Sequence, residues 1–397
     1  MYIKTDSLKS LLTILLLVFA SCLDPYEVEV NNYENLLVIE AMVTDEFKTH
    51  KVQITRSISN LDEIPLPEEN AQVTISCSDG TNEVLKEITP GVYVTDSTKF
   101  RATFDKSYKL QVKTSGGAIY ESNNCKLANR TTISDIYYQR DVEYNRENNR
   151  IEGVRFFVDG IAKDGDHIRW IYEEDWKFSV PFPSQYEFTT EQELEPISAY
   201  NKYCWKKNKS INITLASFSN QELPIIQGKE ICFIPSTLSD RFSLKYSILI
   251  KQLSISAEEY NYWNKIKQSS ENVGGIFGNQ PFHVQGNIKN IANDKEVVLG
   301  YFQLATVSSE RIYIDYNEAF SMGMTSMNVK SGCKTDTIFI GNDEFYSLYE
   351  IYDYHVLNGK LALFDLTYDQ DGLILTDPEC ADCSLSGSPR KPSFWED

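Results

Sequence analysis

Eight cysteines and four histidines are the residues of this chain whose chemistry depends most on spacing. The histidines (His50, His167, His283 and His355) form no pair at metal-ligand spacing, and no His-Glu-x-x-His sequence occurs. A Gly-x-Ser-x-Gly nucleophile elbow, a phosphate-binding loop and a dinucleotide fingerprint are also missing. We therefore expect no catalytic residue, no metal and no cofactor, and we predict that the protein is not an enzyme. A hydrolase with two acting carboxylates stays open, because paired acids among 57 Asp and Glu need no local signature.

Four of the cysteines are candidates for two disulfide bonds, which form readily in exported proteins. Cys77 and Cys125 both fall in an N-terminal β segment and could bridge its sheets. Cys204 and Cys232 enclose a polar loop and form the most natural second pair, which would stabilise the fold by about 2–4 kcal/mol.

Cys380 and Cys383 have the spacing of a zinc or redox pair. A zinc site needs two further ligands, however, and only Cys333 offers itself. A redox pair of the thioredoxin kind needs a βαβ context that the sequence does not show. We therefore predict a structural clamp of the C-terminal tail, with either Cys380 or Cys383 bonded to Cys333.

The N-terminus predicts export and acylation of Cys22. Two lysines precede the apolar run Leu11–Phe19, which is shorter than the roughly 20 residues that a membrane-spanning helix needs. Ala20 and Ser21, directly before Cys22, resemble a bacterial lipobox. We expect a lipoprotein signal peptide at residues 1–21 and a mature chain held by several acyl chains, each contributing about 0.8 kcal/mol per buried CH₂. An ordinary secretory signal with an incidental cysteine is the alternative.

Aromatic side chains gather along one stretch of the second half of the chain. The candidates for a binding surface are Trp170, Tyr172, Trp176, Phe178, Phe182, Tyr186, Tyr203 and Trp205. Aromatic residues that alternate along strands are usually core residues and cross-strand pairs, and we expect that role for about half of them. The others lie on an excursion that contains Pro181 and Pro183, and could form a partner-docking or glycan-stacking surface.

Composition limits the kinds of partner. The chain has 397 residues, with 38 Lys and Arg against 57 Asp and Glu, a net charge of −19 and a pI near 4.8. A phosphate backbone is bound by a basic surface, so nucleic acid is excluded as a partner. Because so acidic a body is repelled by an anionic membrane, lipid on Cys22 must supply the anchor. A hydrophobic fraction of 42% excludes a disordered chain.

The elements that position these residues are mostly strands. After an acidic tether at residues 22–35, residues 36–128 show about seven short alternating strands separated by turn residues such as Pro90-Gly91 and Gly116-Gly117. That pattern predicts an immunoglobulin- or fibronectin-like sandwich.

Residues 129–397 predict a larger β-rich domain, sandwich or barrel-like, with a cysteine-containing C-terminal tail. One helix is expected near residues 257–270, because Ser256 and Glu259 form a capping box before residues at helical spacing. A second short helix is possible around residues 343–352. The protein is therefore expected to be mainly β, with one or two short helices.

Several motifs together resemble one known family, and the resemblance covers nearly the whole mature chain. They are Leu36–Thr44, Gly91–Tyr93, Lys245–Gln252, Glu259–Trp263, Glu271–Phe277, Pro281, Gly286–Ile288, Leu299–Phe302, Cys380–Cys383, Ser386–Gly387 and Lys391–Trp395. The chain resembles the Bacteroidota lipoprotein family of domain of unknown function 4249. That family carries no assigned activity, but its members are typically encoded beside TonB-dependent outer-membrane receptors, which implies an accessory role in uptake or surface assembly. The acidic tether is similar to the surface-export signals of Bacteroidota lipoproteins.

These observations predict an outer-membrane lipoprotein, exposed at the cell surface, that serves a TonB-dependent receptor as an accessory or substrate-binding partner without catalysing a reaction. Two alternatives remain. One is a surface hydrolase of the carboxylate-pair glycosidase type, and the other is a purely structural surface protein.

Overall fold

The computed structural model describes residues 35–58, 63–197, 201–219, 225–237, 239–271, 284–324, 332–341 and 345–396. The expected signal peptide (residues 1–21), Cys22 and His283 lie outside them. The prediction of a mainly β protein with few short helices is confirmed, and the sheets of the described residues close no barrel. None of the helices in this part of the chain has the length and apolar character that crossing a membrane requires.

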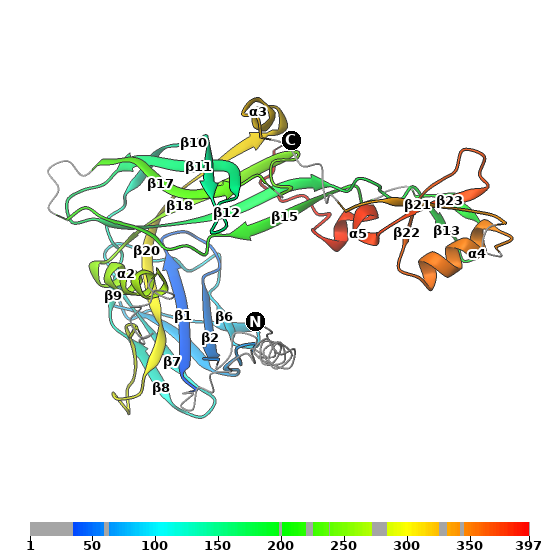
Figure 1. Cartoon of the computed structure of the whole chain (residues 1–397). Coiled ribbons are helices and arrows are strands. Elements are labelled where there is room, and N and C mark those ends of the chain that lie inside the picture. Colours follow the sequence, from blue (N-terminus) through cyan, green and yellow to red (C-terminus); the bar gives the residue numbers. More distant parts are fainter. Residues whose placement is uncertain are drawn as a thin grey trace, which may run out of the picture.

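A nine-stranded sheet runs through the body of the protein (Figure 1). Its order is β15-β12-β18-β20-β1-β2-β6-β5, with β16 paired to β12 beside this path. The strands are β1 (Leu37–Thr44), β2 (Lys51–Arg56), β5 (Lys86–Thr89), β6 (Val92–Val94), β12 (His167–Ser179), β15 (Tyr203–Lys209), β16 (Thr214–Ser217), β18 (Lys245–Ile255) and β20 (Val298–Asp315). Strand β20 joins two halves of the sheet, because residues 298–305 pair in parallel with β1 and residues 306–315 pair antiparallel with β18.

The lower half of this sheet packs on a second sheet of six strands to form a sandwich. The second sheet comprises β3 (Gln72–Cys77), β4 (Asn82–Val84), β7 (Ser107–Lys113), β8 (Ile119–Ser122), β9 (Cys125–Lys126) and β19 (Ile288–Asn290). Alternate residues of each strand fill the space between the sheets, among them the fully buried Ile39, Ile54, Ile75 and Leu110. The period of two along each strand produces this inward-facing apolar set.

The sandwich differs in one respect from the domain expected at residues 36–128. Strand β19 pairs with β8, and β20 pairs with β1, so residues 288–290 and 298–305 complete the two sheets. Phe302 of β20 is fully buried in the sandwich core. Residues 36–128 therefore do not form the sandwich by themselves, and position 128 does not separate two independent sheets.

The upper half of the nine-stranded sheet is covered by a three-stranded sheet of long strands, in the order β10-β11-β17. Their bounds are β10 (Thr132–Tyr144), β11 (Arg150–Ile161) and β17 (Ile225–Pro235). Trp170 and Phe156, from the two facing sheets, are fully buried in this upper core.

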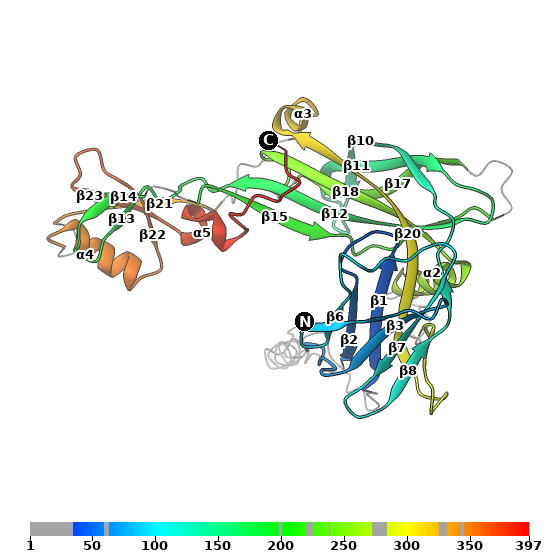
Figure 2. The same ribbon diagram turned by 180° about the vertical axis from the view of Figure 1, so that it is seen from behind.

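An arm projects from the upper half, as both views show (Figure 1 and Figure 2). It contains β13 (Tyr186–Phe188), β14 (Leu194–Pro196), β21 (Thr335–Phe339), β22 (Ala362–Leu366), β23 (Gly372–Thr376), α4 (Leu348–Tyr352), a π-helix (Asp353–Leu357), α5 (Pro378–Ala381) and a 3₁₀ turn (Cys383–Leu385). The arm has a small core of its own around Ile351, Leu363 and Leu373. Helix α4 falls within the range that the sequence allowed for a second helix.

Helix α2 (Ala257–Glu271) confirms the helix expected near residues 257–270, and a shorter helix, α3 (Tyr316–Ser321), follows β20. Ser256 accepts a hydrogen bond from the backbone N–H of Glu259 at 3.1 Å, as the N-cap prediction required. The Glu259 side chain points into the body instead of capping the helix: it is 2% exposed, and its Oε1 has no hydrogen-bond partner among the described residues. Burial raises the pKa of Glu259 to about 7, against a smaller opposing effect of the Arg169 guanidinium.

Glu259 gives the protein a pH-dependent stability. Its pKa in the folded state lies above the unfolded value of 4.5, so its stabilising contribution is complete below pH 4.5 and is lost as the pH rises to about 7. We expect Glu259 to lower the free energy of unfolding by roughly 3 kcal/mol across this window. Urea denaturation of wild type and Glu259→Gln at several pH values measures the difference. Two parallel pH profiles would contradict the assignment.

Two disulfide bonds lie at the base of the arm. Cys333 bonds to Cys380, which is one of the two pairings that the sequence left open. Cys204 bonds to Cys383, so the expected Cys204–Cys232 bond is wrong. The C-terminal tail runs along the edge of β15 and brings Cys383 to Cys204, whereas Cys232 lies on β17 and is buried as a free thiol in the upper core.

The expected Cys77–Cys125 bond is also wrong, since both cysteines are free. Cys77 and Cys125 pair with the same residue, Tyr108, from opposite sides of β7. Neighbouring strands lie about 4.8 Å apart, so two strand spacings separate these cysteines by about 10 Å. A disulfide requires Cα atoms within about 7 Å.

Candidate functional site

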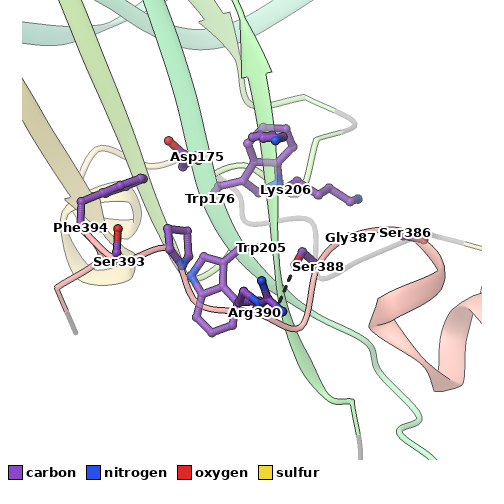
Figure 3. Close-up of a pocket in the computed structure, with 12 residues that line it drawn as sticks. Asp175, Trp176, Trp205, Lys206, Ser386, Gly387, Ser388, Arg390, Ser393 and Phe394 are labelled. Atoms are coloured by element: carbon purple, nitrogen blue, oxygen red, sulfur yellow. Dashed lines mark hydrogen bonds between the residues drawn. The ribbon is translucent and has the colours of Figure 1, made fainter. Parts of the chain in front are cut away.

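A pocket of about 690 Å³ lies between the nine-stranded sheet and the C-terminal tail (Figure 3). Strands β12 and β15 form one wall, and residues 386–394 form the other. The pocket is lined by Asp175, Trp176, Trp205, Lys206, Lys207, Ser386, Gly387, Ser388, Arg390, Pro392, Ser393 and Phe394. In Figure 3 the tail passes Trp205 and carries Phe394 to the side of the pocket opposite Lys206. We call this the aromatic pocket.

Backbone hydrogen bonds fix the tail to the edge of the sheet. The N–H of Trp205 donates to the carbonyl of Ser388 at 2.8 Å, and the N–H of Ser388 donates back to Trp205 at 2.9 Å. Gly387 allows this approach, because a Cβ there would lie 2.6 Å from Cε1 of Phe178 and 2.8 Å from the Trp205 carbonyl oxygen. The tail therefore pairs with an otherwise open strand edge.

Aromatic contacts hold the end of the tail. Trp395 is 4% exposed, and its ring meets the rings of Trp205 and Tyr313 edge-on at centroid distances of 6.3 and 5.9 Å. The Tyr313 hydroxyl donates to the Phe394 carbonyl at 2.9 Å, and the Arg311 guanidinium lies 3.6 Å from the centre of the Phe394 ring. The Phe394 side chain is thereby held beside the pocket while 39% of it stays exposed.

Ion pairs set the charge of the pocket. Asp175 meets Arg311 at 3.1 Å, and burial raises its pKa although Arg311 opposes this. Lys206 meets Asp240 at 2.6 Å, and Asp240 also accepts a hydrogen bond from the Trp176 indole at 2.9 Å. Lys207 and Arg390 bring two further positive charges to the rim.

The lining of the pocket can hold a ligand by stacking and by hydrogen bonding. Aromatic faces, hydroxyls and cationic donors line the pocket, a combination that fits a ligand with a flat apolar face and acceptor atoms. Asp175 is the single carboxylate among the lining residues, and it is engaged by Arg311. A carboxylate-pair hydrolase needs two such groups about 5–10 Å apart.

The aromatic residues proposed from the sequence fall into three groups. Trp170, Trp176 and Phe178 are buried in the upper core, although the edge of Trp176 reaches the pocket. Tyr172, Phe182 and Tyr186 are partly buried; the Phe182 ring packs on Phe364, and Tyr186 joins the core of the arm. Tyr203 is 45% exposed outside the pocket, and Trp205 lines it. The structure thus brings only Trp176 and Trp205 together in one site.

Sequence reasoning missed the contribution of the tail. Ser388, Arg390 and Phe394 complete the pocket, but of these only Phe394 lies in one of the family motifs, Lys391–Trp395. The aromatic pair Phe394-Trp395, close to Pro392, was the available signal, since large aromatic side chains are on average highly buried and so need a packing partner.

The described histidines are packed side chains. His50 is 1% exposed and lies 3.1 Å from the Thr44 hydroxyl, and burial lowers its pKa to about 4. The His167 ring stacks on Tyr260. Within the described part of the chain, no three His, Cys, Asp or Glu side chains gather as metal ligands.

Packed β-sheets, two disulfide bonds and an aromatic pocket with one wall formed by the chain's own tail define a mainly β protein with a concave aromatic site. The chain belongs to the family described as Domain of unknown function (DUF4249), whose model matches residues 23–311. A search of curated proteins finds no match. The matched range includes β12 and β15 but ends before the tail, so one wall of the aromatic pocket lies within the range that defines the family and the other lies beyond it.

Proposed function

We propose that this chain is a lipid-anchored protein of the outer membrane, exposed at the cell surface, that binds a ligand on behalf of a TonB-dependent receptor and catalyses no reaction. The aromatic pocket is the observation that carries the proposal. Trp205 and Phe394 offer ring faces, and Lys207 and Arg390 offer charged donors at the rim. A purely structural surface protein would have no use for such a concave site.

Two further features support export. Disulfide bonds persist in oxidising compartments, and this chain forms two of them at the base of its arm. The N-terminal sequence carries a short apolar run that ends at Ala20-Ser21-Cys22. Association with a receptor follows from the family's usual gene neighbourhood, and the projecting arm provides a surface away from the body for such a contact.

Purification of the full-length protein from its native membranes in mild detergent tests this function. We expect a TonB-dependent receptor to co-purify, together with small molecules that mass spectrometry detects after denaturation. Trp205→Ala is expected to lose at least nine-tenths of the bound small molecules, because a stacking contact contributes about 1 kcal/mol or more beyond the area that it buries. Tyr203→Ala is the matched control, since Tyr203 lies on the same strand outside the pocket.

The same experiment tests the lipid anchor with a third variant. Cys22→Ala removes the acylation site and is expected to move the protein from the membrane to the soluble periplasmic fraction. Recovery of no receptor with the wild-type protein would contradict the proposed association with a TonB-dependent receptor. Equal retention of small molecules by Trp205→Ala and Tyr203→Ala would show that the aromatic pocket does not bind them.

A further inference from the structure

A second concave site lies on the face of the nine-stranded sheet that points away from the sandwich core. It has a volume of about 560 Å³ and shares no lining residue with the aromatic pocket. Residues two apart on each strand line it, such as Glu40 and Met42 on β1 and Arg169 and Ile171 on β12, as expected for one face of a sheet. Trp263 of α2 closes one side.

The charge of this site is opposite to that of the whole protein. Five cationic side chains line it, against the two carboxylates Glu40 and Glu173, whereas the chain carries a net charge of −19. The cationic residues are Lys48, Lys51, Arg169, Lys209 and Lys251. A concave surface with an excess of one charge focuses the electrostatic potential and attracts ions of the other sign.

Only part of this positive charge is neutralised by the protein. Lys251 pairs with Glu173 at 2.7 Å, and Lys48 pairs with Glu46 at 2.5 Å. Lys51 donates to the neutral Gln53 at 2.8 Å, and Lys209 has no ion pair among the described residues. Exposed lysines satisfy their charge with water, so these two alone would not define a site.

Arg169 is the residue that makes the site specific. Its guanidinium lies 3.5 Å from the centre of the Trp263 ring, and its Nη1 donates to Gln303 at 2.9 Å. Its Nε is buried without a hydrogen-bond partner, and no carboxylate of the described residues forms an ion pair with it. Burial lowers the pKa of Arg169 to about 10, against the opposing charge of Glu259, so the group remains positive at neutral pH.

A buried guanidinium without a direct ion pair is costly, because the charges of Glu259 and Glu40, which act on Arg169 from a greater distance, repay its removal from water only in part. The planar fork of an arginine matches the two oxygens of a carboxylate or phosphate, and stacking on Trp263 holds that fork in one plane. We propose that this pocket binds a small oxyanion with two or more negative charges, carried by phosphate or carboxylate groups. Arg169 would bind one oxyanion group directly, while Lys51 and Lys209 attract the rest of the ligand.

Isothermal titration of the full-length, detergent-solubilised protein with tripolyphosphate and with citrate tests this inference. We expect saturable binding of at least one probe that weakens as salt is raised, because the lysines act through screened charge. The tighter probe identifies phosphate or carboxylate as the natural group. Arg169→Gln is expected to raise the dissociation constant at least tenfold, and Arg169→Lys to restore only part of the affinity, since an ammonium lacks the planar fork.

Two further variants guard against misfolding and against a general charge effect. Lys209→Gln alters an exposed side chain, and it is expected to weaken binding severalfold without changing the melting temperature. Arg101→Gln removes the same charge from a surface position, where Arg101 lies over Phe47, and is expected to leave binding unchanged. The inference is overturned if neither probe binds at millimolar concentration, or if Arg169→Gln and Lys209→Gln bind as tightly as Arg101→Gln.

Discussion

Replacing Gly300 with alanine is expected to lower the free energy of unfolding by more than about 4 kcal/mol. Gly300 lies in β20 directly opposite Ile39 of β1, in the parallel pairing that completes the sandwich. Its φ of +91° is a conformation that residues with a side chain rarely adopt, and a Cβ would lie 2.1 Å from the Ile39 carbonyl oxygen. Because two backbones meet there, neither can move aside without breaking the pairing between β1 and β20.

The backbone of Gly286 also packs against Gly300, since a Cβ at Gly286 would lie 1.8 Å from the carbonyl oxygen of Gly300. Gly117→Ala is the matched control: its φ is +86°, but nothing lies within 4 Å of the Cβ position. Gly117→Ala is therefore expected to lower the free energy of unfolding only by the backbone strain, about 1–2 kcal/mol. Urea denaturation followed by circular dichroism measures both, and equal losses for the two variants would contradict the steric explanation.

Removal of the Cys204–Cys383 bond is expected to have the second large effect. The bond joins residues 179 positions apart, so it restricts a long loop of the unfolded chain. The loop-entropy relation gives about 5 kcal/mol for a loop of this length, and measured values usually reach about 2–4 kcal/mol. We expect Cys204→Ser/Cys383→Ser to lose about 3–5 kcal/mol in urea denaturation under oxidising conditions.

The same double variant is expected to loosen the tail and to expose Trp395, which a red shift of tryptophan fluorescence below the unfolding midpoint would report. Cys77→Ser is the control, because Cys77 is partly exposed and carries no disulfide. A loss no larger than that of Cys77→Ser would show that packing of Trp395 on Trp205 and Tyr313 holds the tail without help from the bond.

Local features of the fold could be predicted because local patterns determine them. Strand β1 (Leu37–Thr44) falls among the short alternating strands that the pattern of residues 36–128 predicts, and its residues alternate between buried and less buried positions. Helix α2 was found from its N-cap and helical spacing. In each case the signal lies within the segment itself.

Pairings between distant segments could not be predicted. The sequence pattern predicts two strands in this region, residues 297–306 and 311–315, whereas the structure has the single strand β20 with Ser308 and Ser309 inside it. Both serines lie shortly after the change of partner from β1 to β18, where they pair with Gln252 and Lys251 of β18. The Ser308 hydroxyl accepts a hydrogen bond from the backbone N–H of Ile133. These polar residues therefore lie within a continuous strand and do not mark a turn.

The candidate site could likewise be predicted only where its signal is local. Trp205 could be named from its aromatic neighbourhood, but its partners Ser388 and Phe394 lie far along the chain. Their position depends on the Cys204–Cys383 bond and on the glycine at 387, neither of which has a local signature that names its partner. Anchoring through Cys22 remains a prediction.

Strand β20 pairs with both β1 and β18, and this also affects the order in which the sheets can form. Strand β1 begins at Leu37 and is synthesised well before its parallel partner, which begins at Val298, so the paired residues lie 298 − 37 = 261 positions apart. Such non-local contacts form slowly, because loop closure must be accomplished before they stabilise anything. Until β20 arrives, the edge of β1 is an open template for other strands. The sandwich and the upper half are therefore expected to fold as one cooperative unit, and a fragment that ends at residue 128 would present that open edge to its neighbours and aggregate.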